Sequence, residues 1–378
     1  MTWARPKLLY FVTVDWFFCS HFLERATAAH EAGYDVLVLT NVDRHGEMIS
    51  AAGLRLLHLP ISRSSLNPFG ALLDLLRIML IYRREQPDLI HHVALKPILL
   101  GGLAARLTGF RRVVNAVVGG GYLLTSPHPV VRMIRPLLTL GLRLILNPPG
   151  SRVVFENGDD LANFTKSRLA RSEDSVLIRG SGVAPDHYRP GGISDGLPMV
   201  TLVARLLWDK GVGEFVEAAL TLRQRGVKAR FVIVGDVDPD NRACIDKATL
   251  ETWRSGGAVE LWGLRSDIPQ VLAHTEIACL PSYREGLPRS LLEAMAARLP
   301  CITTDVPGCR EAVRDGDNGI LVPPRNASAL ADAIERLLSN RALSRKMGER
   351  GRLRLEQEFS SQHVKTLTLA LYSEMLSQ

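Results

Sequence analysis

The chain has 378 residues, which at ~150 residues per domain predicts two domains and excludes a single small binding module. Hydrophobic residues make up 46% and charged residues 22%, values typical of globular proteins, so the composition excludes a disordered or fibrous chain. The formal net charge is +7, and the basic excess lies in residues 1–190, which hold 22 Lys/Arg and 15 Asp/Glu, whereas residues 191–378 hold 24 of each.

The first half of the chain alternates short apolar runs with amphipathic stretches. We expect strands at residues 7–14, 35–40, 89–93, 112–118 and 152–156, and helices at 21–32, 69–84 and about 97–107. Strands separated by helices build a parallel sheet with helices on both faces. The first apolar run is too short to span a membrane and no cleavage site follows it, so we expect a cytoplasmic protein. The five scattered cysteines fit neither a disulfide framework nor a structural zinc site.

Basic residues dominate the middle of the first half. Between Asp88 and Glu156 there are eight basic residues and no acidic one: Lys96, Arg106, Arg111, Arg112, Arg132, Arg135, Arg143 and Arg152. Such a field attracts phosphates, and because aromatic side chains do not interleave with it, we expect no nucleic acid partner.

The most apolar part of this segment is residues 130–146. It contains three arginines, whereas a membrane span needs ~20 nearly uncharged residues. Two interpretations stay open: a core helix whose arginines reach solvent, or docking on an anionic membrane surface through residues 122–146.

The alternating pattern starts again after the Pro/Gly-rich segment 189–198. We expect a helix at 212–225 and strands at 199–204, 230–235, 259–262, 277–280, 300–304 and 319–322. The predicted fold class is therefore α/β, with two doubly wound, Rossmann-like domains facing each other across a cleft. Ligands of such sheets bind outside the carboxyl ends of the strands.

The usual nucleotide-binding motifs are absent from the sequence. Neither GxGxxG nor GxxxxGK[ST] occurs, so the sequence lacks the main signature of a nicotinamide dehydrogenase and that of a phosphate-loop NTPase. Instead, the first strand of the second half is followed by ARLLWDKG, in which Arg205 and Lys210 precede a predicted helix. Two cations beside a helix N-terminus can bind an anion, although solvated surface cations would show the same pattern.

A second motif follows the predicted strand at 277–280. The run PSYREGLPRSLLEAMA places Glu285 in a turn and Glu293 in the next helix, about two turns from its start. Gly286 allows a close approach of the backbone to a ligand, and Pro288 suits a first helical turn. A carboxylate in this helix can accept hydrogen bonds from a ribose diol, and the two glutamates together favour a ligand site over an ordinary surface.

These two motifs resemble the retaining, nucleotide-sugar-dependent glycosyltransferases of family 4, which have the GT-B fold. The resemblance implies that Arg205 and Lys210 bind and stabilise the leaving diphosphate and that Glu285 contacts the donor sugar. It further implies donor-binding roles for Glu293 on the ribose, for Gly286, Leu287 and Pro288 near sugar and phosphate, and for Gly263 and Leu264 beside the nucleobase.

The first half is similar to a subgroup that acts in bacterial surface-polysaccharide and lipid-linked oligosaccharide assembly. The resemblance rests on residues 14–21, 90–97, 119–122, 156–157 and 180–183. It implies acceptor-side roles for Asp15, His21, Lys96, Gly120, Gly121 and Asn157. Two of these have equally simple alternatives, because His21 would cap its own turn at a helix N-terminus and Lys96 would be a surface cation.

The Asp236-Val237-Asp238-Pro239-Asp240 segment is an alternative site for a metal ion. Asp-x-Asp can hold Mg²⁺ or Mn²⁺ against a diphosphate, but Arg205 and Lys210 already supply positive charge. We expect a solvated acidic loop near the donor, with no metal required and no cofactor.

The functional prediction is a retaining glycosyltransferase moving a hexose or N-acetylhexosamine from a UDP-sugar to a lipid-linked or saccharide acceptor. Its expected location is peripheral, on the inner face of the cytoplasmic membrane. A sugar-nucleotide 2-epimerase and a non-catalytic binding protein stay open. The expected domains are 1–187 on the acceptor side, 188–360 for the nucleotide sugar, and a C-terminal helix at 361–378 packing back toward the first domain.

Overall fold

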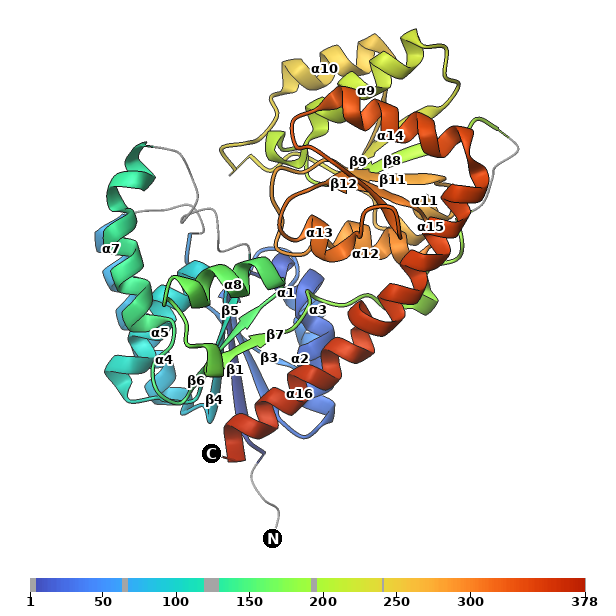
Figure 1. Ribbon diagram of the computed structural model, residues 1–378. Coiled ribbons are helices and arrows are strands. Elements are labelled where there is room, and N and C mark those ends of the chain that lie inside the picture. Colours follow the sequence, from blue (N-terminus) through green and yellow to red (C-terminus); the bar gives the residue numbers. More distant parts are fainter. Residues whose placement is uncertain (1–4, 63–66, 119–128, 192–195, 240, 378) are drawn as a thin grey trace. The chain divides into compact units, whose positions relative to one another are not determined.

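The computed structural model describes residues 5–62, 67–118, 129–191, 196–239 and 241–377 and divides the chain into two compact units (Figure 1). Unit 1 comprises Met1–Ser181 with Gln362–Gln378, and unit 2 comprises Gly182–Ser361. Gly120 and Gly121 lie outside the described residues.

Unit 1 is built on a seven-stranded sheet whose strand pairs are all parallel. The strand order is β3-β2-β1-β4-β5-β6-β7. The strands are β1 Lys7–Val14, β2 Asp35–Asn41, β3 Arg55–His58, β4 Leu89–Val93, β5 Val113–Val117, β6 Ser151–Phe155 and β7 Ser175–Leu177. The central strands β1, β4 and β5 are buried along nearly their whole length because helices cover both faces of a parallel sheet.

Helices cover both faces of this sheet. They are α1 Asp15–His21, α2 Leu23–Glu31, α3 Gly46–Ala51, α4 Pro68–Glu85, α5 Leu95–Thr108, α7 Pro129–Ile145, α8 Gly158–Lys166 and α16 Ser361–Ser377. A hydrophobic core lies on each face of the sheet, and alternate side chains of β1 point into the two cores. Tyr10 packs with residues of α1, α2 and α16, while Phe11 packs with residues of α4 and α5. This alternation follows from the two-residue repeat of a strand.

The C-terminal helix α16 belongs to the first unit although it is last in the chain. The hydroxyl of Tyr372 lies 2.6 Å from the Tyr10 hydroxyl and 2.6 Å from Nδ1 of His91, and all three residues are buried. The division near residue 180 falls between Ser181 and Gly182 rather than after residue 187. The reason is that Val183 pairs with Phe359 and Ser361 by backbone hydrogen bonds, which ties residues after 181 to unit 2.

Unit 2 contains a second parallel sheet, with the strand order β10-β9-β8-β11-β12-β13. The strands are β8 Met199–Val203, β9 Arg230–Val234, β10 Glu260–Gly263, β11 Ile277–Leu280, β12 Cys301–Thr304 and β13 Gly319–Val322. The helices are α9 Val212–Gln224, α10 Lys247–Gly256, α11 Ile268–Ala273, α12 Arg289–Ala296, α13 Cys309–Ala312, α14 Ala327–Ser339 and α15 Arg341–Arg354. Helices α9, α10 and α14 cover one face and α11, α12 and α13 the other (Figure 1).

The two doubly wound parallel sheets confirm the predicted fold class, with differences in detail. The predicted helix 21–32 corresponds to α2 at Leu23–Glu31. The sequence did not predict the separate helix α1, which begins at Asp15 directly after β1 and ends before the break at Phe22. The short elements α3, β3, α8 and β7 were not predicted. Both β3 and β7 are edge strands whose residues are only partly buried or exposed, so their sequences lack the apolar signal of a central strand.

Candidate functional site

The donor-side residues follow three strands that are neighbours in the sheet of unit 2. Arg205 and Lys210 follow β8, Asp238 follows β9, and Glu285 follows β11. The carboxyl ends of parallel strands lie at one edge of the sheet, so the topology gathers these residues from distant parts of the sequence.

The loops after β8 and β11 are held together by their backbones. The carbonyl of Asp209 accepts hydrogen bonds from the Tyr283 amide at 2.8 Å and from the Ser282 hydroxyl at 3.0 Å. Gly211 is the N-cap of α9 and has φ +70°, and a Cβ atom there would lie 2.0 Å from the carbonyl oxygen of Pro281. Only glycine permits this approach, which brings the α9 N-terminus and the Glu285 loop together.

Lys210 and Glu285 form the central ion pair of this group. Lys210 Nζ donates to Glu285 Oε1 at 2.6 Å, and the side chains are 17% and 11% exposed. The backbone carbonyls of Glu285 and Gly286 contact Gly308, where a Cβ atom would lie within 2.6 Å and 2.4 Å of them. Burial, together with the Glu285 carboxylate, raises the pKa of the neighbouring Cys309 thiol to about 12, so this thiol stays protonated at neutral pH.

Arg205 donates to the carboxylate of Asp238. The Asp238 side chain is 16% exposed, so the expectation of a solvated acidic loop is wrong for this residue. An ion pair between neighbouring strand ends explains why the carboxylate is sheltered. Among the described residues, no group of three or more His, Cys, Asp or Glu side chains has an arrangement that could hold a metal ion.

Glu293 lies on α12 within a small polar network. Its Oε1 accepts from Nε of Arg289 at 2.8 Å, and the Tyr188 hydroxyl is hydrogen-bonded to both side chains. Burial and the Glu293 charge raise the pKa of Tyr188. The helix begins at Arg289 with Pro288 as its N-cap, so Glu293 lies about one turn inside it and not two.

The remaining donor-side candidates lie at two places in unit 2. Leu287 is buried and Gly286 precedes it in the Glu285 loop, while Gly263 ends β10 with φ +71°. The Gly263 carbonyl accepts from the Gly235 amide at 2.9 Å, and Leu264 beyond it is 79% exposed. The exposed apolar side chain of Leu264, just beyond the end of β10, offers a surface on which a flat ring such as a nucleobase could lie.

Sequence reasoning missed Tyr188, Arg289 and Asp238 as neighbours of the candidate residues. The spacing of Arg289 and Glu293 by four residues was a usable signal, since residues four apart meet on one helix face. Tyr188 gave no local signal. The Asp-x-Asp segment placed Asp238 near the donor but did not reveal Arg205 as its partner, because only the fold brings these two side chains together.

The acceptor-side candidates also gather at one sheet edge, that of unit 1. Asp15, Lys96 and Asn157 follow or nearly follow β1, β4 and β6, and these strands lie in the order β1-β4-β5-β6. Asp15 is buried and its carboxylate accepts from the amides of Trp16, Asp43 and His45 at 2.7–2.9 Å. Burial favours a higher pKa for Asp15, but the three amides outweigh it and the pKa lies below its ordinary value.

Two acceptor-side residues have local structural roles. His21 ends α1 and does not begin a helix, so the alternative of an N-terminal cap is wrong. Its ring stacks on Phe17 with 4.2 Å between centroids, and its Nδ1 lies 2.6 Å from the Ser20 hydroxyl. Asn157 is the N-cap of α8, where its side chain accepts from the Asp160 amide at 2.7 Å.

Lys96 lines a cavity of about 230 Å³ together with Ser62, Leu73, Asp74 and Arg77. Its Nζ donates to the Ser62 carbonyl at 2.5 Å, and burial lowers its pKa from the ordinary value. The cavity therefore offers two cations and one carboxylate beside the start of α5.

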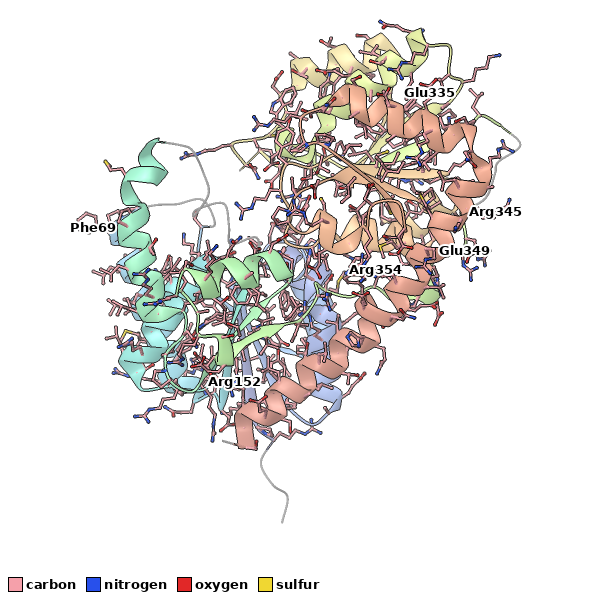
Figure 2. The ribbon with its side chains drawn as sticks, viewed as in Figure 1. Phe69, Arg152, Glu335, Arg345, Glu349 and Arg354 are labelled. Carbon is pink, nitrogen blue, oxygen red and sulfur yellow. The ribbon has the colours of Figure 1, made fainter. Side chains whose placement is uncertain are left out.

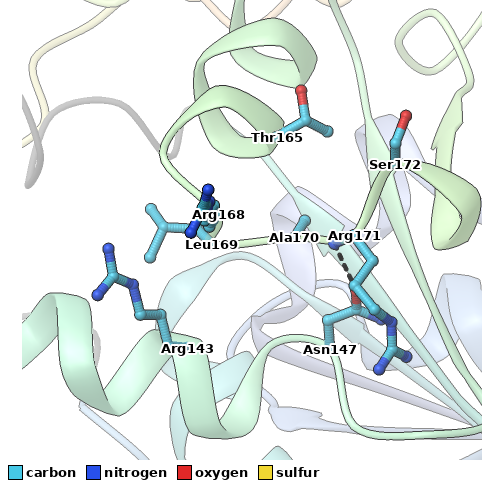
Figure 3. Close-up of a pocket in the computed structure, with 8 residues that line it drawn as sticks. All are labelled: Arg143, Asn147, Thr165, Arg168, Leu169, Ala170, Arg171 and Ser172. Atoms are coloured by element: carbon cyan, nitrogen blue, oxygen red, sulfur yellow. Dashed lines mark hydrogen bonds between the residues drawn. The ribbon is translucent and has the colours of Figure 1, made fainter.

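A larger basic cavity of about 430 Å³ lies between the C-terminal part of α7 and the segment after α8 (Figure 3). Three arginines line it: Arg143, Arg168 and Arg171. Arg171 is paired with Asp174, and Arg143 donates to the Ser167 carbonyl at 3.2 Å. The cavity is lined by more positive than negative groups, and of its three arginines only Arg143 belongs to the basic segment that the sequence analysis singled out.

The arrangement in unit 2 can stabilise negative charge that develops on a diphosphate. Two cations and the N-termini of α9 and α12 lie at one sheet edge, and carboxylates accompany them. Groups of this kind lower the barrier for breaking a bond between a sugar and a nucleoside diphosphate.

Comparisons with known proteins point to the same chemistry. Residues 185–354 match the family "Glycosyl transferases group 1", and residues 7–146 match "Glycosyl transferase 4-like". The chain is 30% identical over 322 residues to the N,N'-diacetylbacillosaminyl-diphospho-undecaprenol alpha-1,3-N-acetylgalactosaminyltransferase of Campylobacter jejuni, covering 82% of this chain and 83% of that protein.

Two further similarities concern an enzyme and a fold. The UDP-Gal:alpha-D-GlcNAc-diphosphoundecaprenol alpha-1,3-galactosyltransferase of Escherichia coli is 25% identical over 284 residues, covering 72% of this chain and 71% of that protein. The structure is also similar to that of Anabaena HepE in complex with UDP-glucose, with a TM-score of 0.77, 17% identity and coverage of 97% and 99% of the two chains. At this identity the structural likeness shows the fold alone.

Proposed function

The chain belongs to glycosyltransferase family 4 and has its GT-B fold, and we propose that it transfers a hexose or N-acetylhexosamine, with retention, from a UDP-sugar to a lipid-linked or saccharide acceptor in bacterial surface-polysaccharide assembly. The observation that carries the proposal is the grouping of Arg205, Lys210 and Glu285 at one sheet edge of unit 2. The names of the C. jejuni and E. coli relatives supply the acceptor class, a saccharide on a diphosphate-linked polyprenol.

In the proposed reaction the bond between the sugar anomeric carbon and the UDP oxygen breaks, and a bond to an acceptor hydroxyl oxygen forms on the same face. The acceptor proton passes to the departing diphosphate, so no protein base is required. Arg205, Lys210 and the amides at the start of α9 stabilise the charge that grows on the diphosphate. No metal and no further cofactor takes part in this step.

The carboxylates have separate roles in this proposal. Glu285 contacts the donor sugar, and Lys210 fixes its orientation through the ion pair at 2.6 Å. Glu293 accepts hydrogen bonds from the ribose hydroxyls, and Arg289 with Tyr188 holds its carboxylate in place. Gly286, Leu287 and Pro288 line the path of sugar and phosphate, and Gly263 with Leu264 lies against the base.

On the acceptor side, Lys96 is proposed to meet the acceptor phosphate in its cavity. Asp15, His21 and Asn157 shape the same sheet edge through their local hydrogen bonds. We propose that the enzyme is peripheral on the inner face of the cytoplasmic membrane, where lipid-linked substrates lie. Among the described residues, no helix is long and apolar enough to cross a bilayer.

The experiment that tests the proposal is a screen of UDP-, GDP- and ADP-sugars with a synthetic polyprenyl diphosphate saccharide. The expected result is a UDP-dependent elongated product, with release of free UDP and the anomeric configuration of the donor retained, as read by NMR. An inverted product would overturn retention. Isomerised nucleotide sugar without release of free nucleotide would show an epimerase instead.

A further inference from the structure

Helix α4 has two apolar faces, and in the part of the chain that the structure describes only one of them is covered. Ile78 and Tyr82 are buried, and Leu75 and Met79 pack beside them on the core of unit 1. The other face exposes five large apolar side chains: Phe69 at 79%, Leu72 and Leu73 at 55% each, Leu76 at 48% and Leu80 at 65%. Figure 2 labels Phe69, the first of them. We call these five residues the α4 stripe.

The stripe is continuous along the helix. At ~100° of rotation per residue, its five positions fall within a sector of about 100°, opposite the buried Ile78 and Tyr82. Soluble proteins rarely leave so many neighbouring apolar side chains in water, and a patch of this kind marks an interaction surface. The stripe therefore requires an occupant.

Charge along the helix indicates which occupant fits. Arg83 and Arg84 follow the stripe in the last turn, and Arg77 lies at its border, all three being exposed. The helix has only two acidic residues, Asp74 and Glu85, and both lie on the side facing the protein, with side chains 14% and 10% exposed. A stripe of leucines flanked by arginines, with no carboxylate on the same side, is typical of helices that lie in the interface of an anionic bilayer.

The neighbouring helices support the same occupant. Helix α5 packs against both α4 and α7, and α7 exposes Met133, Leu140 and Leu144 on its surface. Leu73 of the stripe and Arg77 also line the cavity that contains Lys96. A lipid-linked molecule held at the stripe would therefore place its polar group beside that cavity.

We infer that α4 is a membrane-docking helix, whose stripe enters the headgroup region of a bilayer containing anionic lipid while Arg77, Arg83 and Arg84 contact lipid phosphates. This inference rests on the proposed function, because a lipid-linked acceptor needs an enzyme at the membrane. It differs from docking through residues 122–146 in assigning the apolar part of the attachment to another helix.

The test is co-sedimentation of the full-length chain with vesicles of phosphatidylglycerol and phosphatidylethanolamine, at low and at high salt. The variant Leu72→Gln/Leu76→Gln/Leu80→Gln, which leaves the lining of the Lys96 cavity unchanged, should lower the partition coefficient at least ~10-fold at both salt concentrations, since it removes three apolar side chains from the contact. The variant Arg77→Gln/Arg83→Gln/Arg84→Gln should lower binding at low salt only, because charge attraction is screened at high salt.

A matched control is Leu197→Gln/Leu220→Gln/Leu353→Gln in unit 2, where the three leucines are 47%, 42% and 51% exposed. This control should bind vesicles like the wild type. If the control and the α4 variant bind equally well, the inference is overturned. It is also overturned if wild-type chain ignores the vesicles and sediments as a dimer that the α4 variant dissociates, because the stripe would then join two copies.

The proposed reaction is checked separately with a short-chain, water-soluble acceptor. The α4 variant should transfer sugar to this acceptor at the wild-type rate and lose activity only on acceptors embedded in vesicles. Absence of transfer by the wild type itself would contradict the proposed function, whereas vesicle binding would still report on α4.

Discussion

Both candidate cations of unit 2 are paired with carboxylates, Arg205 with Asp238 and Lys210 with Glu285. A cation that is already held in one position loses less freedom when a phosphate arrives, so under the proposed function these ion pairs would orient Arg205 and Lys210 for the diphosphate. Each cation would then stabilise part of the charge that develops on the diphosphate in the transition state, so that removing either one should slow the reaction.

Arg205→Ala and Lys210→Ala should each lower the rate of sugar transfer by at least ~10²-fold, because one lost charge contact in such a site costs ~3–4 kcal/mol. The measurement is kcat/KM for UDP-sugar. Arg225→Ala is the control, since Arg225 pairs with Asp332 and Glu335 on the surface of unit 2. Wild-type turnover in either site variant would remove the phosphate assignment.

Glu293→Ala should weaken the binding of free UDP, because the ribose loses its hydrogen-bond acceptor. Tyr188→Phe should weaken it less, by less than ~10-fold, since it removes one hydrogen bond that holds the carboxylate. Titration calorimetry with UDP measures both. Unchanged affinity in Glu293→Ala would place this residue outside the ribose pocket.

The pKa of Asp15 lies below its ordinary value, so this carboxylate stabilises the fold when ionised. The contribution is present above the ordinary pKa of 3.8 and is lost as the pH falls through the lowered pKa of the folded state. Urea unfolding between pH 6 and about 2 should show this loss in the wild type. Asp15→Asn should be less stable at pH 6 and lack this part of the pH dependence. If the variant's free energy of unfolding varied with pH as in the wild type, the role assigned to Asp15 would be wrong.

At the scale of elements, the donor site depends on the close approach of two loops. Gly211, the N-cap of α9, lies against Pro281. The backbone of Gly235 lies so close to Ala204 that a Cβ atom at residue 235 would be 1.8 Å from the Ala204 carbonyl oxygen. The sheet can bring the ends of β8, β9 and β11 together only because these positions lack side chains.

Gly211→Ala should destabilise unit 2 by more than ~2 kcal/mol for two reasons. The new Cβ would clash with the Pro281 carbonyl, and a residue other than glycine pays a conformational cost in the left-handed region. Gly226→Ala is the matched control, with φ +78° and no atom within 4 Å of its Cβ position. Thermal unfolding measures both. Equal losses in the two variants would show that backbone conformation alone, and not the loop contact, sets the cost.

At the scale of the whole molecule, positive charge is distributed unequally between the two halves of the chain. The basic excess of the first half lies in the unit that carries the α4 stripe and the arginine-lined cavity, and the second half is balanced. In the proposed function, unit 2 would bind its anionic donor through a few placed cations, and unit 1 would attract anionic surfaces through many dispersed ones.

If Arg205 and Lys210 stabilise the diphosphate as proposed, sugar transfer should persist in excess EDTA. Asp238→Asn should also remain independent of metal. The measurement is UDP release with and without added Mg²⁺ or Mn²⁺. Loss of activity in chelator, restored by either ion and abolished in Asp238→Asn, would assign a metal to the Asp236–Asp238 segment.

The sequence alone determined the repeated α/β pattern and the family, and it singled out Arg205, Lys210, Glu285 and Glu293 as candidate site residues. These features are local, since strand and helix periodicity and short motifs are carried by neighbouring residues. Sequence also located the basic excess of the first half.

Only the tertiary structure decided which residues meet. Tyr188 reaches Glu293, Asp238 reaches Arg205, and α16 returns to Tyr10 and His91 through contacts between distant parts of the chain. The α4 stripe was likewise hidden, because an apolar residue in a sequence does not show whether the fold will bury it. Burial is a property of the packed chain, and only the packed chain leaves Leu76 in water and Ile78 in the core.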